Sequence, residues 1–305
     1  MKPVEDKIWE RLKAIGLAHD ARDPSTARPG QSVRQTAGFI ELPFHGRMRS
    51  ASDRGWPVLL TGPAATGKTT AVKLLAKQRE AVAYTQQCYR TLSVEEVRGT
   101  RGLNEKGTTF EPGPLTRSLL DPNGWYFLDE INMADPGILS LLNNLLDGTG
   151  VVTIPETGQV IPRSPNWRFF GAFNPGYVAT SELNQALKSR CQVIECDFLP
   201  MEIEARLIAE KYSAMPKDTV AVVNVAAAVR AARCNGDHDF DMCLRTCFQL
   251  WEVWQEIGDP LEAFRQVVLP KIGDEGAFGP VREGLLRAVE MIIGRPRRNR
   301  KKSQL

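Results

Sequence analysis

One segment of the chain carries residues whose types and spacing suit the binding of phosphate groups. Residues 62–69 (GPAATGKT) satisfy the pattern G-x-x-x-x-G-K-[ST] at every specified position. Glycines let the backbone fold around an anion so that successive N–H groups point inward. In that arrangement Lys68 reaches the β- and γ-phosphates, and the hydroxyl of Thr69 takes one coordination position on Mg²⁺. The residues predicted to surround the phosphates of ATP are Gly62, Pro63, Ala64, Ala65, Thr66, Gly67, Lys68, Thr69 and Thr70.

A pair of carboxylates, Asp129 and Glu130, follows the apolar run 125–128 (WYFL). A carboxylate at the carboxyl end of a parallel strand can hold Mg²⁺ through water, which is the role we predict for Asp129. Glu130 points in a different direction and is predicted to orient and deprotonate the attacking water. The alternative is an acidic pair before a helix over 134–146, where negative charge is favoured. Beside the phosphate segment, the pair favours hydrolysis of ATP over its storage.

The elements that must position these residues alternate along the chain as far as Pro200. Runs that are apolar throughout, separated by helical stretches, indicate a parallel sheet covered on both faces. The predicted strands are 57–60, 81–85, 123–131, 168–173 and 192–196, and a helix is predicted from Lys68 to about Gln78. After Pro200 the predicted elements are helices, over 201–214, 218–233, 239–257, 260–269 and 278–293. The predicted fold class is therefore α/β, a parallel P-loop sheet with helices on both faces, followed by a small all-helical lid domain.

We predict four parts along the chain. Residues 4–18 have helical spacing of apolar side chains, and residues 20–36 are rich in Pro, Ser, Gly and charge, so 1–36 is an N-terminal helix and linker arm. The α/β ATPase domain covers 37–200 and the helical lid domain covers 201–293. Residues 294–305 form a basic tail that is predicted to be disordered.

Composition limits the classes of function. The chain is 42% hydrophobic and 25% charged, which is ordinary for a globular protein. A formal net charge of +3 is too small to argue for nucleic acid, which leaves the basic tail as a weak candidate for that contact. There is no run of 18 or more apolar residues, and residues 1–16 (MKPVEDKIWERLKAIG) lack the apolar core of a signal peptide. We expect a soluble cytoplasmic protein without a membrane contact.

The six cysteines of the chain raise the question of a metal site. None forms the C-x₂-C pair that structural zinc prefers. The nearest approach to a cluster is Cys234, His238, Cys243 and Cys247, of which the last two are four residues apart on a predicted helix. We interpret these cysteines as small buried residues of a reduced cytosolic protein.

Three segments together resemble the MoxR lineage of AAA+ ATPases: 62–70, 128–136 (LDEINMADP) and 170–177 (FGAFNPGY). Within that lineage, 110–119 (FEPGPLTRSL) and 174–177 (NPGY) are most similar to the CbbQ/NorQ branch, with gas-vesicle GvpN as a cousin. The resemblance covers roughly residues 40–250. It implies a ring, typically a hexamer, in which ATP and Mg²⁺ bind near the boundary between subunits.

The resemblance also implies roles for individual residues. Asn174 matches the sensor-1 position, where an amide holds the attacking water or the γ-phosphate, although a turn-forming Asn before Pro is the alternative. Arg190 matches the arginine finger that enters the neighbouring subunit's site, with Lys188 as a nearby competitor. Arg245 matches sensor 2 at the start of a lid helix, with a surface arginine as the alternative. Arg117 is a weaker candidate for a second contact between subunits.

Two segments resemble the family's insertions that face the pore of the ring. Residues 98–115 are glycine-rich with a central turn, and residues 150–164 are predicted to form a β-hairpin around Glu156-Thr-Gly158. Surface loops without a function are the alternative. Ring ATPases often use such hairpins to grip a client, and we favour that interpretation.

The function that we predict is a chaperone-like motor that uses ATP hydrolysis to remodel or activate a partner protein. In this family the usual partner carries a von Willebrand factor A domain, which would be supplied separately because the chain holds no D-x-S-x-S motif. The alternatives are a nucleic-acid-associated motor or restriction-type translocase subunit, and a scaffold that binds ATP without turnover. The absence of a basic stripe with aromatic residues argues against the first, and Glu130 and Asn174 argue against the second.

Overall fold

The computed structural model describes residues 42–104, 107–175 and 183–293, which form two units. The first unit comprises 42–62 and 67–196, and the second comprises 63–66 and 197–293. The predicted N-terminal helix and linker arm (1–36) and the basic tail lie outside the described residues, as does the end of the NPGY segment.

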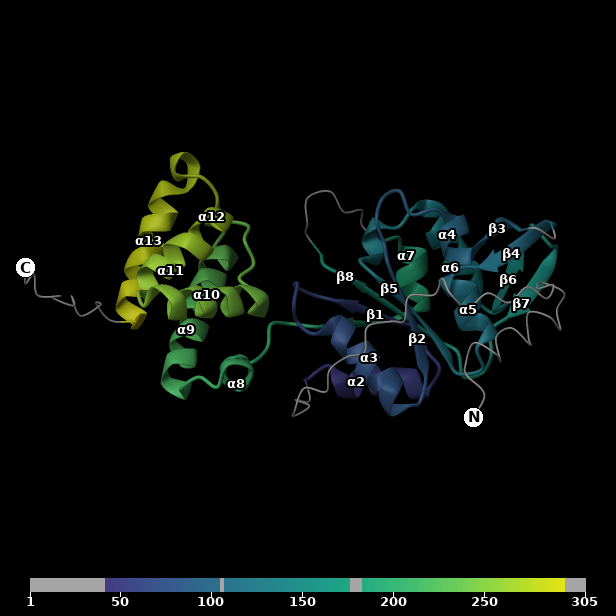
Figure 1. Ribbon diagram of the computed structural model, residues 1–305, viewed down its shortest axis with the longest axis horizontal. Coiled ribbons are helices and arrows are strands. Elements are labelled where there is room, and N and C mark those ends of the chain that lie inside the picture. Colours follow the sequence, from purple (N-terminus) through teal and green to yellow (C-terminus); the bar gives the residue numbers. More distant parts are fainter. Residues whose placement is uncertain (1–41, 105–106, 176–182, 294–305) are drawn as a thin grey trace, which may run out of the picture. The chain divides into compact units, whose positions relative to one another are not determined.

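Five parallel strands form the central sheet of the first unit (Figure 1). In spatial order they are β2 (Val82–Gln87), β5 (Gly124–Asp129), β8 (Arg168–Phe173), β1 (Val58–Thr61) and β9 (Gln192–Glu195). Every neighbouring pair of these strands runs parallel. The carboxyl ends of parallel strands lie along one edge of the sheet, so the residues that follow β1, β5 and β8 come together there.

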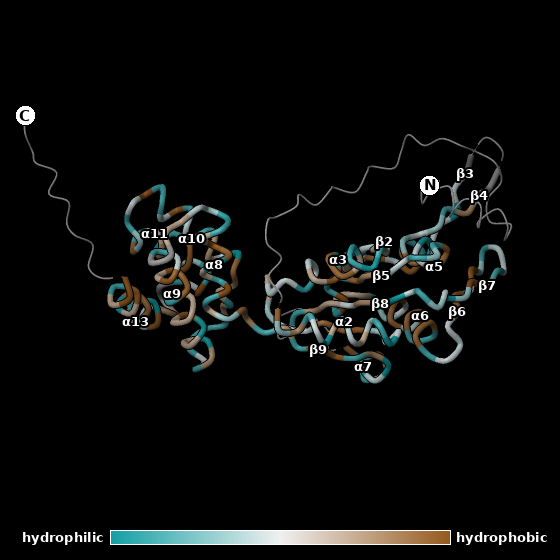
Figure 2. The backbone as a smooth tube through the Cα atoms, turned by 90° about the horizontal axis from the view of Figure 1, so that it is seen from below, coloured by the Kyte–Doolittle hydropathy of each residue, from teal (hydrophilic) through white to brown (hydrophobic). Residues whose placement is uncertain are grey.

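Helices flank this sheet (Figure 2). They are α2 (His45–Asp53), α3 (Lys68–Gln78), α4 (Val94–Arg98), α5 (Pro114–Leu120), α6 (Pro136–Leu146) and α7 (Gln185–Arg190), with a short 3-10 turn η1 (Ile131–Met133). Tyr126 and Leu128 of β5 share a buried cluster with Leu119 of α5 and Leu142 of α6. Phe127, which points to the opposite face of the strand, is equally buried. The strand is apolar throughout because both of its faces are covered, which confirms the predicted α/β class.

Two antiparallel hairpins stand apart from the central sheet. They are β3 (Gly99–Asn104) with β4 (Gly107–Pro112), and β6 (Val151–Ile154) with β7 (Gln159–Pro162). The second hairpin confirms the predicted one, with Val152 opposite Ile161. Arg98, which ends α4, and Glu156, in the turn of the second hairpin, form an ion pair at 3.0 Å with little exposed side-chain surface. This pair joins the base of the first insertion to the turn of the second.

The second unit is helical, as predicted. Its helices are α8 (Met201–Tyr212), α9 (Pro216–Cys234), α10 (Leu244–Ile257), α11 (Pro260–Val267), α12 (Leu269–Ile272) and α13 (Glu275–Ile293). A single apolar cluster, which includes Ile208, Val229, Leu250, Phe264 and Val289, holds them together. In the part of the chain that the structure describes, no helix is long and apolar enough to cross a membrane.

The helix predicted over 239–257 starts later than expected, at Leu244. Cys243 has extended φ and ψ angles and precedes the helix, so the prediction that Cys243 and Cys247 share a helix is wrong. Two contacts hold the preceding residues in a non-helical path: the Phe240 N–H donates to Nδ1 of His238, and Nε of Arg230 donates to the Met242 carbonyl. Across the described residues, no group of three or more His, Cys, Asp or Glu side chains is arranged to hold a metal ion.

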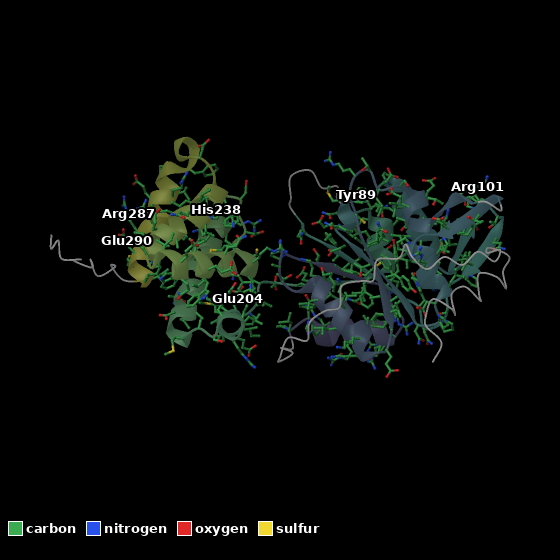
Figure 3. The ribbon with its side chains drawn as sticks, viewed as in Figure 1. Tyr89, Arg101, Glu204, His238, Arg287 and Glu290 are labelled. Atoms are coloured by element: carbon green, nitrogen blue, oxygen red, sulfur yellow. The ribbon has the colours of Figure 1, made fainter. Side chains whose placement is uncertain are left out.

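A buried ion pair stabilises the second unit. Glu204 of α8, labelled in Figure 3, is 1% exposed and accepts two hydrogen bonds from Arg230 of α9, at 2.8 and 2.9 Å. The guanidinium also lies over the ring of Phe198, 4.0 Å from its centroid. Since both partners are largely removed from water, the pair depends on this complete set of contacts.

Candidate nucleotide-binding site

The loop between β1 and α3 has a backbone that explains its residue types. Gly62 and Gly67 both have positive φ, at 148° and 89°, a region in which a side chain is strained. A Cβ atom on Gly62 would also overlap with the backbone carbonyl of Cys196. Inside the loop, the Thr66 hydroxyl donates to the Pro63 carbonyl at 3.1 Å. The glycines are therefore required by the path of the chain from strand to helix.

Lys68 is the first residue of α3 and is only 7% exposed. Its Nζ donates to the Gly62 carbonyl and to Oδ1 of Asn174, each at 2.8 Å. Burial lowers the pKa of Lys68, while the nearby charges of Cys196 and Asp129 act in the opposite direction. Asn174 follows β8, so this contact joins the loop to the end of a second strand.

Thr69 and Asp129 also meet at this edge of the sheet. The Thr69 hydroxyl donates to Oδ2 of Asp129 at 2.7 Å, and Oδ1 of the same carboxylate accepts from the Glu130 N–H at 3.1 Å. The Cys88 N–H donates to the Asp129 carbonyl at 2.8 Å, which ties β5 to the end of β2. A hydroxyl and a carboxylate that approach so closely are the hard oxygen ligands that Mg²⁺ prefers, so the residues fit this ion.

Glu130 has a left-handed backbone, with φ at 54°. Such a conformation costs a non-glycine residue about 1–3 kcal/mol. Nε2 of Gln87, the last residue of β2, lies 3.4 Å from Oε2 of Glu130. Gln87 was not predicted from the sequence, since nothing in the sequence shows that the ends of β2 and β5 are neighbours.

Asn132 is a second residue that was not predicted from the sequence. It lies in the turn η1, is 6% exposed, and donates through Nδ2 to the backbone carbonyl of Asn174 at 3.2 Å. A polar side chain between Ile131 and Met133 was the signal that could have indicated a buried contact. The bond connects the turn that follows Glu130 with the residue that contacts Lys68.

The arginines assigned by resemblance occupy different places. Arg190 ends α7, where Nη1 donates to the Ala186 carbonyl at 2.7 Å and Nη2 lies 3.9 Å from Asp147. Lys188 lies in the same helix, two residues earlier. Arg117 of α5 donates through Nε to the Pro112 carbonyl at 2.8 Å. Arg245 is exposed in the first turn of α10, in the second unit. Their roles remain predictions.

The edge of the sheet therefore gathers one lysine, one hydroxyl, two carboxylates and three side-chain amides around a glycine loop. Residues 57–191 match the family model described as the AAA domain, dynein-related subfamily. This part of the chain is similar to an AAA domain. The matched residues include Lys68, Asp129, Asn174 and Arg190, whereas Arg245 lies outside them.

Curated relatives match about half of the chain. An uncharacterised protein of Staphylococcus epidermidis is 35% identical over 159 residues, which are 50% of this chain and 60% of that protein. An uncharacterised protein of Staphylococcus aureus is 33% identical over 159 residues, which are again 50% of this chain and 60% of that protein. The match thus spans 60% of the length of these curated relatives.

Solved structures with a similar chain path include a candidate ATPase of Cytophaga hutchinsonii. It is 16% identical, with 95% of this chain and 94% of that chain covered and a TM-score of 0.47. A mutant of RuvB from Thermotoga maritima is 15% identical, with 74% and 70% covered and a TM-score of 0.49. Neither likeness bears on the roles of individual residues.

Proposed function

We propose that this protein is a Mg²⁺-dependent ATPase of the AAA+ type that acts as one subunit of a ring. The observation that carries the proposal is a pair of contacts at one edge of the sheet. Nζ of Lys68 donates to Oδ1 of Asn174 at 2.8 Å, and the Thr69 hydroxyl donates to Oδ2 of Asp129 at 2.7 Å. Phosphoryl transfer needs positioned charge more than covalent chemistry, and this arrangement provides it.

Each group then has a chemical role. The backbone N–H groups of the loop and the Lys68 ammonium bind the β- and γ-phosphates. Thr69 and Asp129 would hold Mg²⁺, which would offset charge on the phosphate oxygens. Glu130 accepts a proton from the attacking water, and the amide of Asn174 orients that water or the γ-phosphate.

The ring would supply the remaining charge. Arg190 has about a third of its side chain exposed, at 32%, and is proposed as the finger that reaches a neighbouring subunit's nucleotide. Arg245 is proposed to contact the nucleotide of its own subunit. In the CbbQ/NorQ branch of the MoxR lineage, which this chain resembles, turnover would activate a client together with a von Willebrand factor A domain partner. The joined hairpins would contact that client.

Nucleotide binding and turnover test the first part of this proposal. With a fluorescent ATP analogue, we expect Lys68→Ala to lose affinity, because the buried ammonium is removed, while Glu130→Gln keeps affinity and loses turnover. Lys73→Ala is the matched control, because Lys73 is an exposed lysine of the same helix α3. If the wild type and Lys68→Ala bound the ATP analogue with equal affinity, the proposed phosphate site would be wrong.

Mixed subunits test the ring. Arg190→Ala and Glu130→Gln are each expected to lack turnover alone, and a mixture should regain part of it at sites that combine an intact Glu130 with a neighbour's intact Arg190. Lys188→Ala tests the competing finger. Turnover that rises with added DNA or RNA would favour the nucleic-acid motor over the activation of a protein client.

A further inference from the structure

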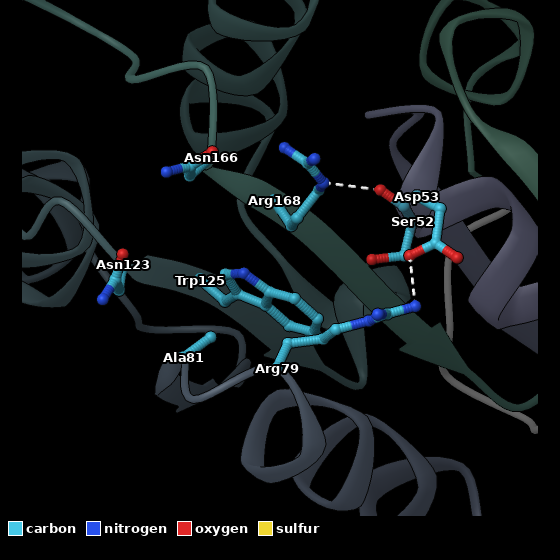
Figure 4. A pocket seen from close by; sticks show the side chains of 8 residues that line it. All are labelled: Ser52, Asp53, Arg79, Ala81, Asn123, Trp125, Asn166 and Arg168. Carbon is cyan, nitrogen blue, oxygen red and sulfur yellow. Dashed lines mark hydrogen bonds and ion pairs between the residues drawn. The ribbon is translucent and has the colours of Figure 1, made fainter.

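A pocket lies at the opposite edge of the central sheet from the candidate nucleotide site. It has a volume of about 270 Å³ and is lined by Ser52, Asp53, Arg79, Ala81, Asn123, Trp125, Asn166 and Arg168 (Figure 4). Trp125 stands near the start of β5, whose last residue is Asp129, and Arg168 is the first residue of β8. The pocket is therefore formed by the amino ends of the strands whose carboxyl ends carry the nucleotide site.

Arg168 is a half-buried cation that has no carboxylate partner within ion-pair distance among the described residues. Its Nε donates to the Ser52 carbonyl at 2.6 Å, and Nη1 donates to the carbonyls of Pro165 and Trp167 at 2.7 and 3.0 Å. Its Nη2 group makes no hydrogen bond to any described residue. Burial lowers the pKa of Arg168, and the charge of Asp53 opposes this effect. A guanidinium that is partly removed from water favours an anion beside it.

The other charges of the pocket are already paired. Arg79 and Asp53 form an ion pair at 2.6 Å, which Figure 4 shows beside the indole of Trp125. Since these two charges cancel, the lining keeps a net charge of one positive unit, on Arg168. A pocket with this balance favours a ligand that carries one negative charge.

Uncharged donors point to the same kind of ligand. Trp125 is 4% exposed and stacks on Phe170 with the ring centroids 5.2 Å apart, but its indole N–H has no acceptor among the described residues. The exposed side-chain amides of Asn123 and Asn166 complete the lining. The nitrogen of this N–H is not fully buried, so an acceptor atom that enters the pocket can replace water as its hydrogen-bond partner.

We propose that this pocket binds a carboxylate group through Arg168, Trp125 and the two asparagine amides. A carboxylate offers one charge and two acceptor oxygens in a plane, which suits a guanidinium edge and a neighbouring N–H. The pocket lies just below the usual size of small-molecule sites, about 300–1,000 Å³, so the group is a small acid or an Asp or Glu side chain of a polypeptide. The proposal is independent of ATP hydrolysis.

The indole resonance of Trp125 in the full-length protein tests the proposal by NMR. The chain has six tryptophans, and Trp125→Phe assigns the signal. The probes are acetate, the peptide acetyl-Gly-Glu-Gly-amide and its Gln counterpart, all at constant ionic strength. We expect acetate and the Glu peptide to shift the indole signal saturably, and the Gln peptide to leave it unchanged. Tighter binding of the Glu peptide identifies a polypeptide as the source, and tighter binding of acetate identifies a free acid.

Two variants and a control separate binding from folding. Arg168→Gln should weaken acetate binding about tenfold or more, because a charged hydrogen-bond donor is lost. Asn123→Asp, on the exposed rim, should also weaken binding without a demand on the fold. Arg287→Gln removes one positive charge from an exposed side chain in the other unit and should leave the affinity unchanged. The proposal would be overturned if none of the probes shifted the indole signal. It would also be overturned if acetate shifted that signal equally in the wild type and in Asn123→Asp. Arg168 would then serve only to connect backbone segments through its hydrogen bonds to carbonyl groups.

Discussion

The buried amide of Asn132 offers a test of how the candidate nucleotide site is held together. Its Nδ2 donates to the Asn174 carbonyl at 3.2 Å, and Oδ1 of Asn174 accepts from Lys68 at 2.8 Å. The turn η1 that carries Asn132 begins directly after Glu130. Asn132→Ala therefore removes a link between the carboxylate predicted to activate water and the amide predicted to orient it.

The size of the effect follows from the kind of bond that is lost. A neutral hydrogen bond contributes about 0.5–1.5 kcal/mol, and a carbonyl left without its donor in a buried place costs about 1–3 kcal/mol. We expect a loss of unfolding free energy of about 1–2 kcal/mol. If a similar amount is lost from the positioning of Asn174 in the transition state, turnover falls about tenfold, since 1.36 kcal/mol corresponds to one factor of ten. ATP affinity should stay nearly constant, because Asn132 makes no predicted contact with phosphate.

The assay is a double-mutant cycle on the rate of ATP turnover and on nucleotide affinity, with Asn144→Ala on the exposed side of α6 as the control. If Asn132 acts by positioning Asn174, then Asn132→Ala should have little further effect on turnover in the Asn174→Ala background. An equal fractional loss in both backgrounds, or a loss of affinity that matches the loss of turnover, would refute this reasoning. Thermal unfolding of all four proteins shows whether stability accounts for the change.

Three further predictions concern the rest of the chain. Gly62→Ala should abolish ATP binding, measured with a fluorescent analogue, because its Cβ overlaps with a backbone carbonyl; retained affinity would contradict the strained loop. Glu204→Ala should cost about 3–5 kcal/mol of unfolding free energy in urea, since its guanidinium partner is left buried and unpaired, whereas Glu210→Ala at an exposed pair should cost less than about 1 kcal/mol. Iodoacetamide should label the exposed Cys234 before the buried Cys88, and early labelling of Cys88 would count against its burial. Burial raises the pKa of the Cys88 thiol to about 12. The stability that the neutral Cys88 thiol contributes is therefore lost as the pH rises above the ordinary thiol value of 9.0.

The sequence predicted the central sheet well because each of its strands is a compact apolar run. The strand over 168–173 has the same bounds in the structure, and α3 covers Lys68–Gln78 as expected. The hairpin over Gly99–Pro112 was missed as paired strands, because its glycines and threonines give no alternation of apolar and polar residues. Its pairing depends instead on contacts such as the close approach of Gly99 to Phe110, which a sequence pattern does not encode.

Some residues of the candidate site could be predicted from the sequence, whereas others depend on which strands are neighbours in the sheet. Lys68, Thr69 and Asp129 could be assigned from sequence because each stands at the end of a predicted strand or the start of a helix, and parallel strands bring those ends to one edge. Gln87 and Asn132 could not, because their importance depends on which strands are neighbours and on one turn after Glu130. The order β2-β5-β8-β1-β9 places β5 between β2 and β8, so the carboxylates at its end can contact residues from both sides. Residues such as Gln87, which contact the motif residues from a neighbouring strand, therefore follow from the strand order. A linear sequence motif identifies only Lys68, Thr69 and Asp129 themselves.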